Sequence, residues 1–330
     1  MKKYNVAILG ATGLVGREML KVLEARNFPI NELHLFASRK NDARTLIFRG
    51  SPCQINGVDD ESFDGIDIVL GAAPNAVAQK YADKIVKSGA IFIDNSSAFR
   101  LDKDVPLIVP SINPDDISKH KGIISNPNCL TIIVLTAIHP IYKLSRVKTI
   151  QITSFQAVSG VGQAGLDELL IQYESIMGDQ DKDYPTFGHP IVNNVIPQIS
   201  TILENGYTGE EVKVYNEGRK ILHDDALKAS CTCVRVPVER CHSAAVVLSL
   251  EHKVSLSEIE HSLIADTNIV FDGKSIPMPY SSIKGDMVYV GRVREDACVK
   301  NGIALWCCAD QIQKGAATNA VQIAELCINR

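Results

Sequence analysis

The chain has 330 residues, of which 45% are hydrophobic and 22% charged, as is ordinary for a soluble globular protein of two domains. Its formal net charge of −4 gives no reason to expect a nucleic acid or an anionic membrane as partner. No apolar run reaches the roughly 20 residues of a membrane span, and the one near the N-terminus is too short for a secretory signal. We therefore expect a cytoplasmic protein.

Strands and helices alternate through the first part of the chain. Apolar runs predict strands at 4–9, 32–38, 67–73, 91–97 and 123–126, with helices at 17–25 and 75–89. This alternation is typical of a parallel, doubly wound sheet. Residues 1–128 are therefore expected to form an α/β dinucleotide-binding domain of the Rossmann type.

The pattern changes after residue 128. A helix is expected at 130–143, followed by strands at 147–160, 229–238, 243–254, 286–296 and 302–310, with helices at 165–178 and 255–265. These strands lack crossover helices between them, which favours an antiparallel or mixed sheet. We expect residues 129–311 to form an α+β catalytic and dimerisation domain. Residues 312–330 would return to the first domain through a final helix.

The first predicted strand ends in a glycine turn with the pattern G-x-x-G-x-x-G, at Gly10, Gly13 and Gly16. A plain strand-to-helix turn can contain such glycines. The strand before and the amphipathic helix after favour dinucleotide binding, with the pyrophosphate on the first amides of the helix. The expected contacts are Gly10, Thr12, Gly13, Leu14 and Val15.

The end of the second predicted strand bears on the choice of dinucleotide. An NAD site places an acidic residue there for the ribose diol, whereas this chain has Ser38, Arg39 and Lys40. A solvated basic loop is the alternative. Hydroxyl and cationic groups suit a 2′-phosphate, so the sequence favours NADP, bound in part by Ser38 and Arg39.

Nine cysteines are scattered through the chain. An odd number without zinc-binding spacing predicts reduced thiols and no metal site. Cys129 differs because "SNPN" precedes it and an apolar helix follows. Amides at a helix start stabilise a thiolate, yet a buried cysteine at a tight turn is an equal alternative from these residues alone. His242, close to Arg235 in a polar cluster between two strands, is the best partner for a nucleophile.

Seven pieces of the sequence together resemble the aspartate-β-semialdehyde dehydrogenase family. They are "GATGLVG" at 10–16, "DNSSAFR" at 94–100, "SNPNC" at 125–129, "SFQAVSGVGQAG" at 154–165, "NEGRKIL" at 216–222, "CVRVPVERCHS" at 233–243 and "KGAATNAVQIAE" at 314–325. They span nearly the whole chain in family order, so no single common motif carries the resemblance. The resemblance implies a fold like that of glyceraldehyde-3-phosphate dehydrogenase and a homodimer.

The resemblance also implies a reaction. Family members reduce β-aspartyl phosphate to aspartate β-semialdehyde with NADPH, reversibly, in the biosynthesis of lysine and diaminopimelate, threonine and methionine. Cys129 would attack the acyl carbon to form a thioester, because a thiolate is strongly nucleophilic near neutral pH. His242 would be the general acid/base, and Gln156 would position the substrate or the thiol.

Further roles follow from the resemblance alone. Arg235 would clamp the substrate carboxylate, since Arg binds a carboxylate with two parallel hydrogen bonds. Arg235 and His242 are seven residues apart, so we expect a bend near Pro237 to bring them together. The other implied contacts are Arg100, Lys220 and Asn128 for phosphate, Glu217 for the substrate ammonium, and Ser159, Gly160 and Asn319 for the cofactor.

Two alternatives remain. N-acetyl-γ-glutamyl-phosphate reductase shares the fold and the thioester chemistry, but typically has Gly where this chain has Asn128. A non-catalytic NADP-binding homologue is the other, and it has no physical reason to keep Cys129, Gln156, Arg235 and His242 together. The sequence therefore favours an enzyme.

Overall fold

The computed structural model describes residues 2–38, 44–59, 62–175, 184–282 and 285–329. The chain divides into two compact units, Met1–Asn128 with Ala316–Arg330, and Cys129–Gly315. The return of the chain to the first unit thus begins at Ala316 instead of the expected residue 312. Within the described ranges, no helix is long and apolar enough to cross a membrane.

The first unit contains a seven-stranded sheet in the order β3-β4-β2-β1-β5-β6-β7. Its strands are β1 (Tyr4–Leu9), β2 (Ile30–Ala37), β3 (Thr45–Phe48), β4 (Ser51–Gly57), β5 (Ile68–Gly71), β6 (Ile91–Asp94) and β7 (Ile123–Ser125). All neighbouring pairs are parallel except β3 and β4. Those two form a hairpin that the sequence did not predict, with a turn at Arg49 and Gly50, where φ is 48° and 77°. Positive φ at both turn residues matches the twist of a hairpin.

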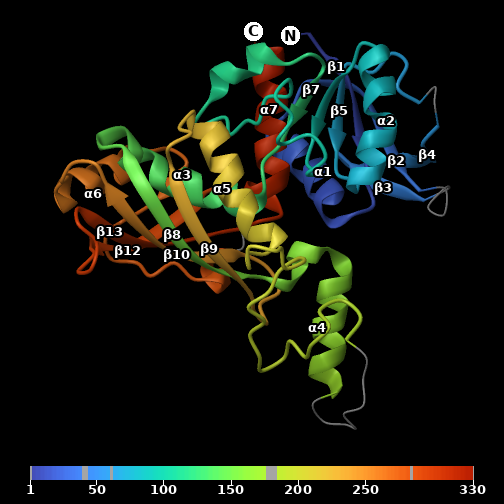
Figure 1. Ribbon diagram of the computed structural model, residues 1–330. Coiled ribbons are helices and arrows are strands. Elements are labelled where there is room, and N and C mark those ends of the chain that lie inside the picture. Colours follow the sequence, from blue (N-terminus) through green and yellow to red (C-terminus); the bar gives the residue numbers. More distant parts are fainter. Residues whose placement is uncertain (1, 39–43, 60–61, 176–183, 283–284, 330) are drawn as a thin grey trace. The chain divides into compact units, whose positions relative to one another are not determined.

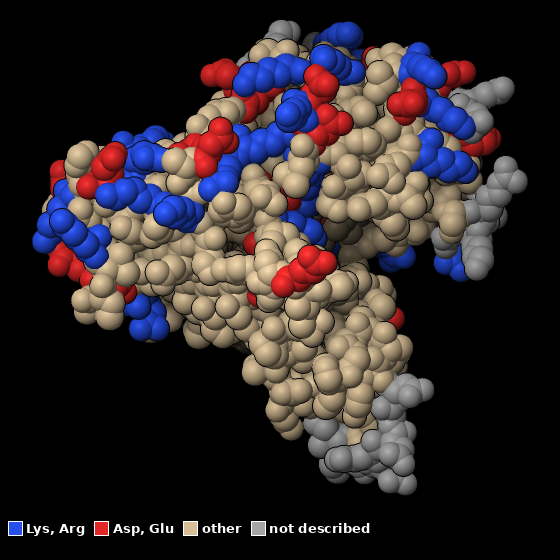
Figure 2. All heavy atoms as spheres, viewed as in Figure 1, with Lys and Arg blue, Asp and Glu red and all other residues tan. Residues whose placement is uncertain are grey.

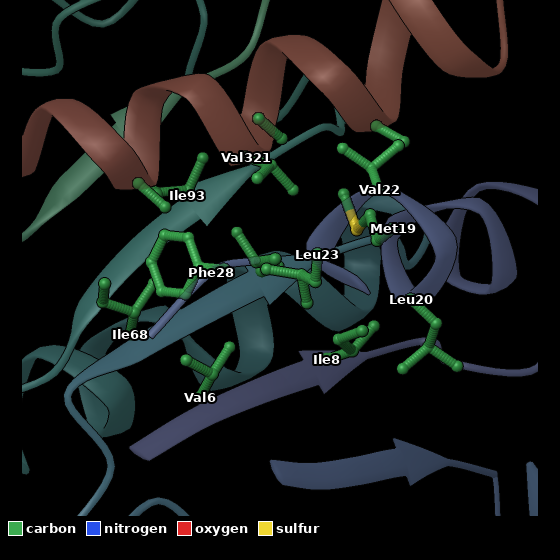
Figure 3. Packing of buried hydrophobic residues seen from close by; sticks show 14 of the residues in the cluster. Val6, Ile8, Met19, Leu20, Val22, Leu23, Phe28, Ile68, Ile93 and Val321 are labelled. Carbon is green, nitrogen blue, oxygen red and sulfur yellow. The ribbon is translucent and has the colours of Figure 1, made fainter. Parts of the chain in front are cut away.

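Helices cover both faces of this sheet. They are α1 (Leu14–Ala25), α2 (Asn75–Lys87) and α7 (Asn319–Ile328). α1 and α7 cover one face of the sheet (Figure 1). Val6 and Ile8 of β1 pack in a core with these two helices (Figure 3). Ala7 and Leu9 point to the other face and pack in a core with α2. Strands buried on both faces are characteristic of parallel α/β sheets, which explains the continuous apolar runs in the sequence.

The second unit contains a six-stranded mixed sheet in the order β11-β12-β13-β10-β8-β9. Its strands are β8 (Val147–Gln156), β9 (Lys228–Arg235), β10 (His242–Leu250), β11 (Ile269–Val270), β12 (Val288–Glu295) and β13 (Gly302–Ala309). β8 pairs with β9 in parallel, whereas β10 lies antiparallel to both β8 and β13. The expectation of an antiparallel or mixed sheet is therefore confirmed in its mixed form.

One face of the second sheet is covered by helices. They are α3 (Cys129–Leu144), α5 (Gly209–Leu222) and α6 (Leu256–Ala265), and α3 packs on β8, β10, β12 and β13 (Figure 1). α4 (Gln163–Ser175) instead packs against the short helical turn Val158–Val161. The other short turns are Pro114–Lys119, Pro279–Ser281 and the π-helical Gln313–Thr318. α3 is apolar nearly all round, because it is buried on most sides.

Candidate active site

Three neighbouring strands of the second sheet have one terminus each on the same side of the sheet. Gln156 is the last residue of β8 and lies in register with Arg235, the last residue of the parallel strand β9. His242 begins β10, which runs antiparallel to β8 on its other side. The side chains of all three residues are buried, and His242 is 0% exposed. The strand pairing therefore gathers an amide, a guanidinium and an imidazole at one place.

The peptide groups of Ala157 connect two of these side chains. Arg235 donates from Nη1 to the carbonyl of Ala157 at 2.6 Å, and the Ala157 N–H donates to Nδ1 of His242 at 3.1 Å. The chain reverses between the end of β9 and the start of β10, over residues 236–241. The expected bend near Pro237 is therefore present and accounts for the approach of two residues seven positions apart.

Gly160 lies against the same two side chains. A Cβ atom at this position would be 2.8 Å from Nη1 of Arg235 and 3.3 Å from Nε2 of His242. No larger residue fits there without moving the guanidinium. The turn that contains Ser159 and Gly160 is thus part of the site, whichever ligand it contacts.

Burial controls the protonation of His242. Removal from water, and secondarily the positive charge of Arg235, lowers the pKa of His242 to about 3, while Glu210 opposes this shift. Because Nδ1 accepts from Ala157, the proton of the neutral ring resides on Nε2. Nε2 has no hydrogen-bond partner among the described residues. His242 is therefore a neutral imidazole with a buried N–H available for a ligand.

Cys129 is the first residue of α3 and is half-buried. The partial positive charge at a helix N-terminus favours a negative charge at this position. Burial lowers the pKa of Arg235, and the negative charges of Glu210 and Cys129 oppose that effect, so the thiol lies within electrostatic reach of the guanidinium. Gly315 packs directly on the cysteine, since a Cβ at 315 would be 2.8 Å from the Cβ of Cys129.

The first turn of α5 contributes an ion pair that the sequence reasoning missed. Lys213 Nζ lies 2.9 Å from Oε2 of the buried Glu210, and the charge of Glu210 acts on both Arg235 and His242. Thr208 and Glu211 form a capping box that starts the helix. That Thr-x-x-Glu spacing is the signal that could have placed Glu210 in the first turn of a helix.

Glu217 and Lys220 lie toward the other end of α5. Arg219, in the last turns of this helix, donates from Nε to the carbonyl of Leu227 at 2.8 Å, and Leu227 directly precedes β9. By contrast, Glu211 near the start of α5 accepts from the N–H of Cys233, close to the end of β9. The helix thus runs antiparallel to β9, and Lys220 is roughly 15 Å along the axis from Glu210.

The glycine turn of the first unit has the geometry of a phosphate cradle. Gly10 has a φ of 94°, and a Cβ there would be 2.5 Å from the carbonyl oxygen of Ala72. A Cβ at Gly16 would be 2.3 Å from the Gly10 carbonyl oxygen, so this glycine lets α1 pack on β1. The N-cap Gly13 is exposed, and the described first turn of α1 contains no acidic residue. These features fit a pyrophosphate on the first amides of α1.

Two further predicted cofactor contacts, Ser38 and Asn319, also lie in the first unit. Ser38 is exposed just after β2, whose Phe36 carbonyl accepts from the N–H groups of Gly10 and Ala11; Arg39 lies outside the described residues. Asn319 is 0% exposed, and its Nδ2 donates to the carbonyl of Ile108 and to Oδ1 of Asn126. Its Oδ1 has no partner among the described residues, which fits an amide-bearing ligand.

Arg100 and Asn128 are both buried in the first unit. Arg100 donates from Nη2 to the carbonyl of Asn95 at 2.7 Å, and its charge acts on Asp94. Throughout the part of the chain that the structure describes, no group of three or more His, Cys, Asp or Glu residues is placed to hold a metal ion.

A Rossmann-type unit, and a second unit with a cysteine at a helix start and a buried arginine and histidine, together define a nicotinamide-dependent oxidoreductase. Residues 5–120 match the semialdehyde dehydrogenase NAD binding domain, and residues 138–314 match the semialdehyde dehydrogenase dimerisation domain. The chain therefore contains both domains of a semialdehyde dehydrogenase.

Relatives resemble the chain over its whole length. Aspartate-semialdehyde dehydrogenases of Aquifex aeolicus and Synechocystis are 44% and 43% identical, over 98% and 99% of this chain and 98% of each relative. The crystal structure of aspartate semialdehyde dehydrogenase II from Vibrio cholerae has a TM-score of 0.97 at 40% identity and covers 99% of both chains. The chain therefore belongs to the aspartate-semialdehyde dehydrogenase family. The expected fold and family are confirmed, and the chain is an enzyme that binds a nicotinamide dinucleotide.

Proposed function

We propose that this enzyme catalyses the reversible, NADP-dependent reductive dephosphorylation of β-aspartyl phosphate to aspartate β-semialdehyde. A Vibrio cholerae structure that is 40% identical and covers 100% of this chain is described as complexed with ASA. The observation that supports the reaction most directly is the juxtaposition of Cys129, Arg235 and His242 within one unit. An acyl-transfer site needs a nucleophile, a proton donor and a cation for an anionic substrate group, and these three residues have the chemistry that each role requires.

Cys129 is the proposed nucleophile. Its thiolate attacks the acyl carbon, the C–O bond to phosphate breaks, and phosphate leaves with the electron pair. The product is a thioester on Cys129, which keeps an electrophilic carbonyl. The first amides of α3 stabilise the thiolate before attack, and Gln156 at the end of β8 is proposed to orient the acyl group.

His242 is proposed to donate from Nε2 to the oxygen that gains negative charge during acyl transfer and reduction. The described tautomer suits this role, because Nδ1 is occupied by the Ala157 N–H and Nε2 carries the proton. Donors aimed at a developing oxyanion stabilise the transition state strongly when water is excluded. The burial of His242 supplies that exclusion.

Arg235 is proposed to bind the substrate α-carboxylate through its guanidinium. We further infer that Glu210 meets the substrate ammonium and Lys213 the phosphate, in place of the expected Glu217 and Lys220. The electrostatic reach of Glu210 to Arg235 and His242 supports this assignment. Arg100 and Asn128 remain proposed phosphate contacts on the resemblance alone.

The cofactor supplies a hydride when it is bound. Gly10, Thr12, Gly13, Leu14 and Val15 are proposed to hold its pyrophosphate. Ser38 and Arg39 would read the 2′-phosphate and so prefer NADP. The proposed contacts at the nicotinamide end are Ser159, Gly160 and the amide oxygen of Asn319, for which the described residues offer no partner.

A substrate comparison tests the proposed function. The purified enzyme is assayed for formation of reduced cofactor with aspartate β-semialdehyde or N-acetylglutamate semialdehyde, each with and without phosphate, and with NADP or NAD. We expect phosphate-dependent turnover with aspartate β-semialdehyde and NADP. Preference for N-acetylglutamate semialdehyde would instead assign the enzyme to glutamyl phosphate chemistry, and no turnover with either would favour a non-catalytic homologue.

We also infer a homodimer that assembles through the second unit, whose family description names dimerisation. The described side chains of Thr153, Thr232 and Ala245 are exposed on three adjacent strands of its sheet. A sheet face of small uncharged residues is suited to a subunit contact. A reduced catalytic thiol would be maintained in the cytoplasm, which is the proposed location.

A further inference from the structure

Both polar atoms of the buried Gln311 side-chain amide form hydrogen bonds. It follows β13 and is 3% exposed. Its Oε1 accepts from the N–H of Cys241 at 2.8 Å, and its Nε2 donates to Oγ of Ser159 at 2.7 Å. One side chain thus joins the residue before His242 to the residue before Gly160.

The backbone at Cys241 needs such support. Its φ is 80°, in a region that residues other than glycine rarely adopt. Strained backbone of this kind persists only where surrounding contacts hold it. The hydrogen bond from the N–H of Cys241 to Gln311 acts at the strained residue itself, directly before β10 begins with His242. Gln311 therefore holds the backbone conformation of Cys241, which sets the orientation of the next residue, His242.

The other end of Gln311 fixes the facing turn. Oγ of Ser159 also donates to the carbonyl of Glu239, and the Ser159 N–H donates to that carbonyl at 3.3 Å. The next residue, Gly160, is the one whose added Cβ would meet Arg235 and His242. The placement of this turn decides how closely the chain approaches both side chains.

We propose that Gln311 is a positioning residue for His242, acting through Cys241 on one side and through Ser159 on the other. This inference rests on the proposed role of His242 in catalysis. Gln311 holds the imidazole and the Ser159–Gly160 turn in one arrangement, so that Nε2 of His242 is aimed at the reacting oxygen.

The test is Gln311→Met, which removes both hydrogen bonds and keeps most of the side-chain volume. Misplacement of a catalytic group by about 1 Å can cost up to roughly 100-fold in rate, so we expect kcat to fall roughly 10- to 100-fold. KM for aspartate β-semialdehyde should stay within about threefold, because Arg235 and Glu210, the proposed substrate contacts, are unchanged. Steady-state kinetics measure both.

Gln172→Met is the matched control. Gln172 is another buried glutamine, 7% exposed, whose Oε1 accepts from the N–H groups of Ile191 and Val192 and whose Nε2 donates to Glu168. It lies in α4 and has no role in the proposed chemistry. We expect this variant to lower Tm by about as much as Gln311→Met, with kcat unchanged.

A double-mutant cycle with His242→Gln separates positioning from general damage. If Gln311 acts through His242, Gln311→Met should lower kcat by less than about threefold in the His242→Gln background. An equal fall in both backgrounds, or a loss of Tm without loss of kcat, would overturn the inference alone. Wild-type kcat in the single variant His242→Gln would overturn the proposed role of His242 and, with it, this inference.

Discussion

At the scale of single residues, burial decides which form of His242 the protein holds. The ring is 0% exposed, and removal from water lowers its pKa to about 3. Arg235, whose Nη1 binds the same residue as Nδ1 of His242, adds to this effect. A neutral histidine that carries its proton on Nε2 is a hydrogen-bond donor throughout the pH range above this pKa.

This burial makes stability depend on pH. In the unfolded chain, His242 takes up a proton near the ordinary histidine pKa of 6.5. In the folded chain its pKa is lowered to about 3, so it stays neutral down to about that pH. Between these values the unfolded state binds more protons, so acid favours unfolding. Through His242 alone, we expect the free energy of unfolding to fall by about 2 kcal/mol between pH 6.5 and pH 5.

Urea unfolding of the wild type and His242→Gln at both pH values measures this contribution. The variant should lose less stability on acidification than the wild type. His252→Gln, at an exposed histidine, is the control and should behave like the wild type. A wild-type pH dependence that persists in His242→Gln would contradict the account of His242 as a buried neutral ring.

The sequence predicted several residues of the site but not their arrangement. Cys129 at the start of a helix follows from local turn chemistry, which a sequence records. The bend near Pro237 was expected because the resemblance places Arg235 and His242, seven residues apart, in one site. The contact of Gly160 with Arg235 and His242, and the bonds of Gln311, depend on strand register between segments far apart in the chain. No local pattern encodes such register.

At the scale of elements, the direction of α5 determines which of its charges reach the site. The helix begins near the end of β9, through the bond of Glu211 to Cys233, and ends near the start of β9, through the bond of Arg219 to Leu227. Glu210 and Glu217 are seven residues apart and share a helix face. Only the direction of α5 relative to β9 decides which of the two glutamates lies near Arg235 and His242, and the sequence does not give that direction.

A pair of matched variants tests this reading of α5. Glu210→Gln should lower kcat/KM for aspartate β-semialdehyde more than tenfold, because a buried charge that meets the substrate ammonium is lost. KM for NADP should remain within about threefold. Glu217→Gln, the same change two turns along the helix, should lower kcat/KM much less. The reverse ranking would return the ammonium site to Glu217.

Other elements show where sequence patterns suffice. The parallel strands of the first unit were predictable, since burial on both faces makes them continuous apolar runs. The hairpin β3–β4 was missed because its strands are half-exposed and its Arg-Gly turn is a weaker signal than Asn-Gly. α5 was not predicted as a helix because it carries few apolar residues, although its capping box marks its start.

At the scale of the whole molecule, the second unit leaves apolar and uncharged surface open. Besides the sheet face at Thr153, Leu170 and Ile171 of α4 are 50% and 53% exposed. Figure 2 shows few charged side chains around α4 on the face displayed, whereas both signs of charge are scattered elsewhere. Surface of this kind is typical of a subunit contact.

Thr153→Arg tests the proposed dimer. A charge at the centre of this sheet face would be desolvated on association, so we expect the dimer to dissociate at micromolar concentration. Sedimentation velocity gives the mass, and Thr45→Arg, at an exposed threonine of the first unit, is the control that should stay dimeric. A wild type that sediments as a monomer, or a Thr153→Arg variant that remains a dimer, would contradict the proposal.

The proposed chemistry requires Cys129 to carry the acyl group, so isolation of the intermediate tests it. The enzyme is mixed with β-aspartyl phosphate without reduced cofactor, quenched in acid, and analysed by intact-protein mass and by peptide mapping. We expect one aspartyl group per chain on the peptide that contains Cys129, released phosphate in equal amount, and neither in Cys129→Ala. An aspartyl group on another cysteine, or phosphate release without an adduct, would contradict it.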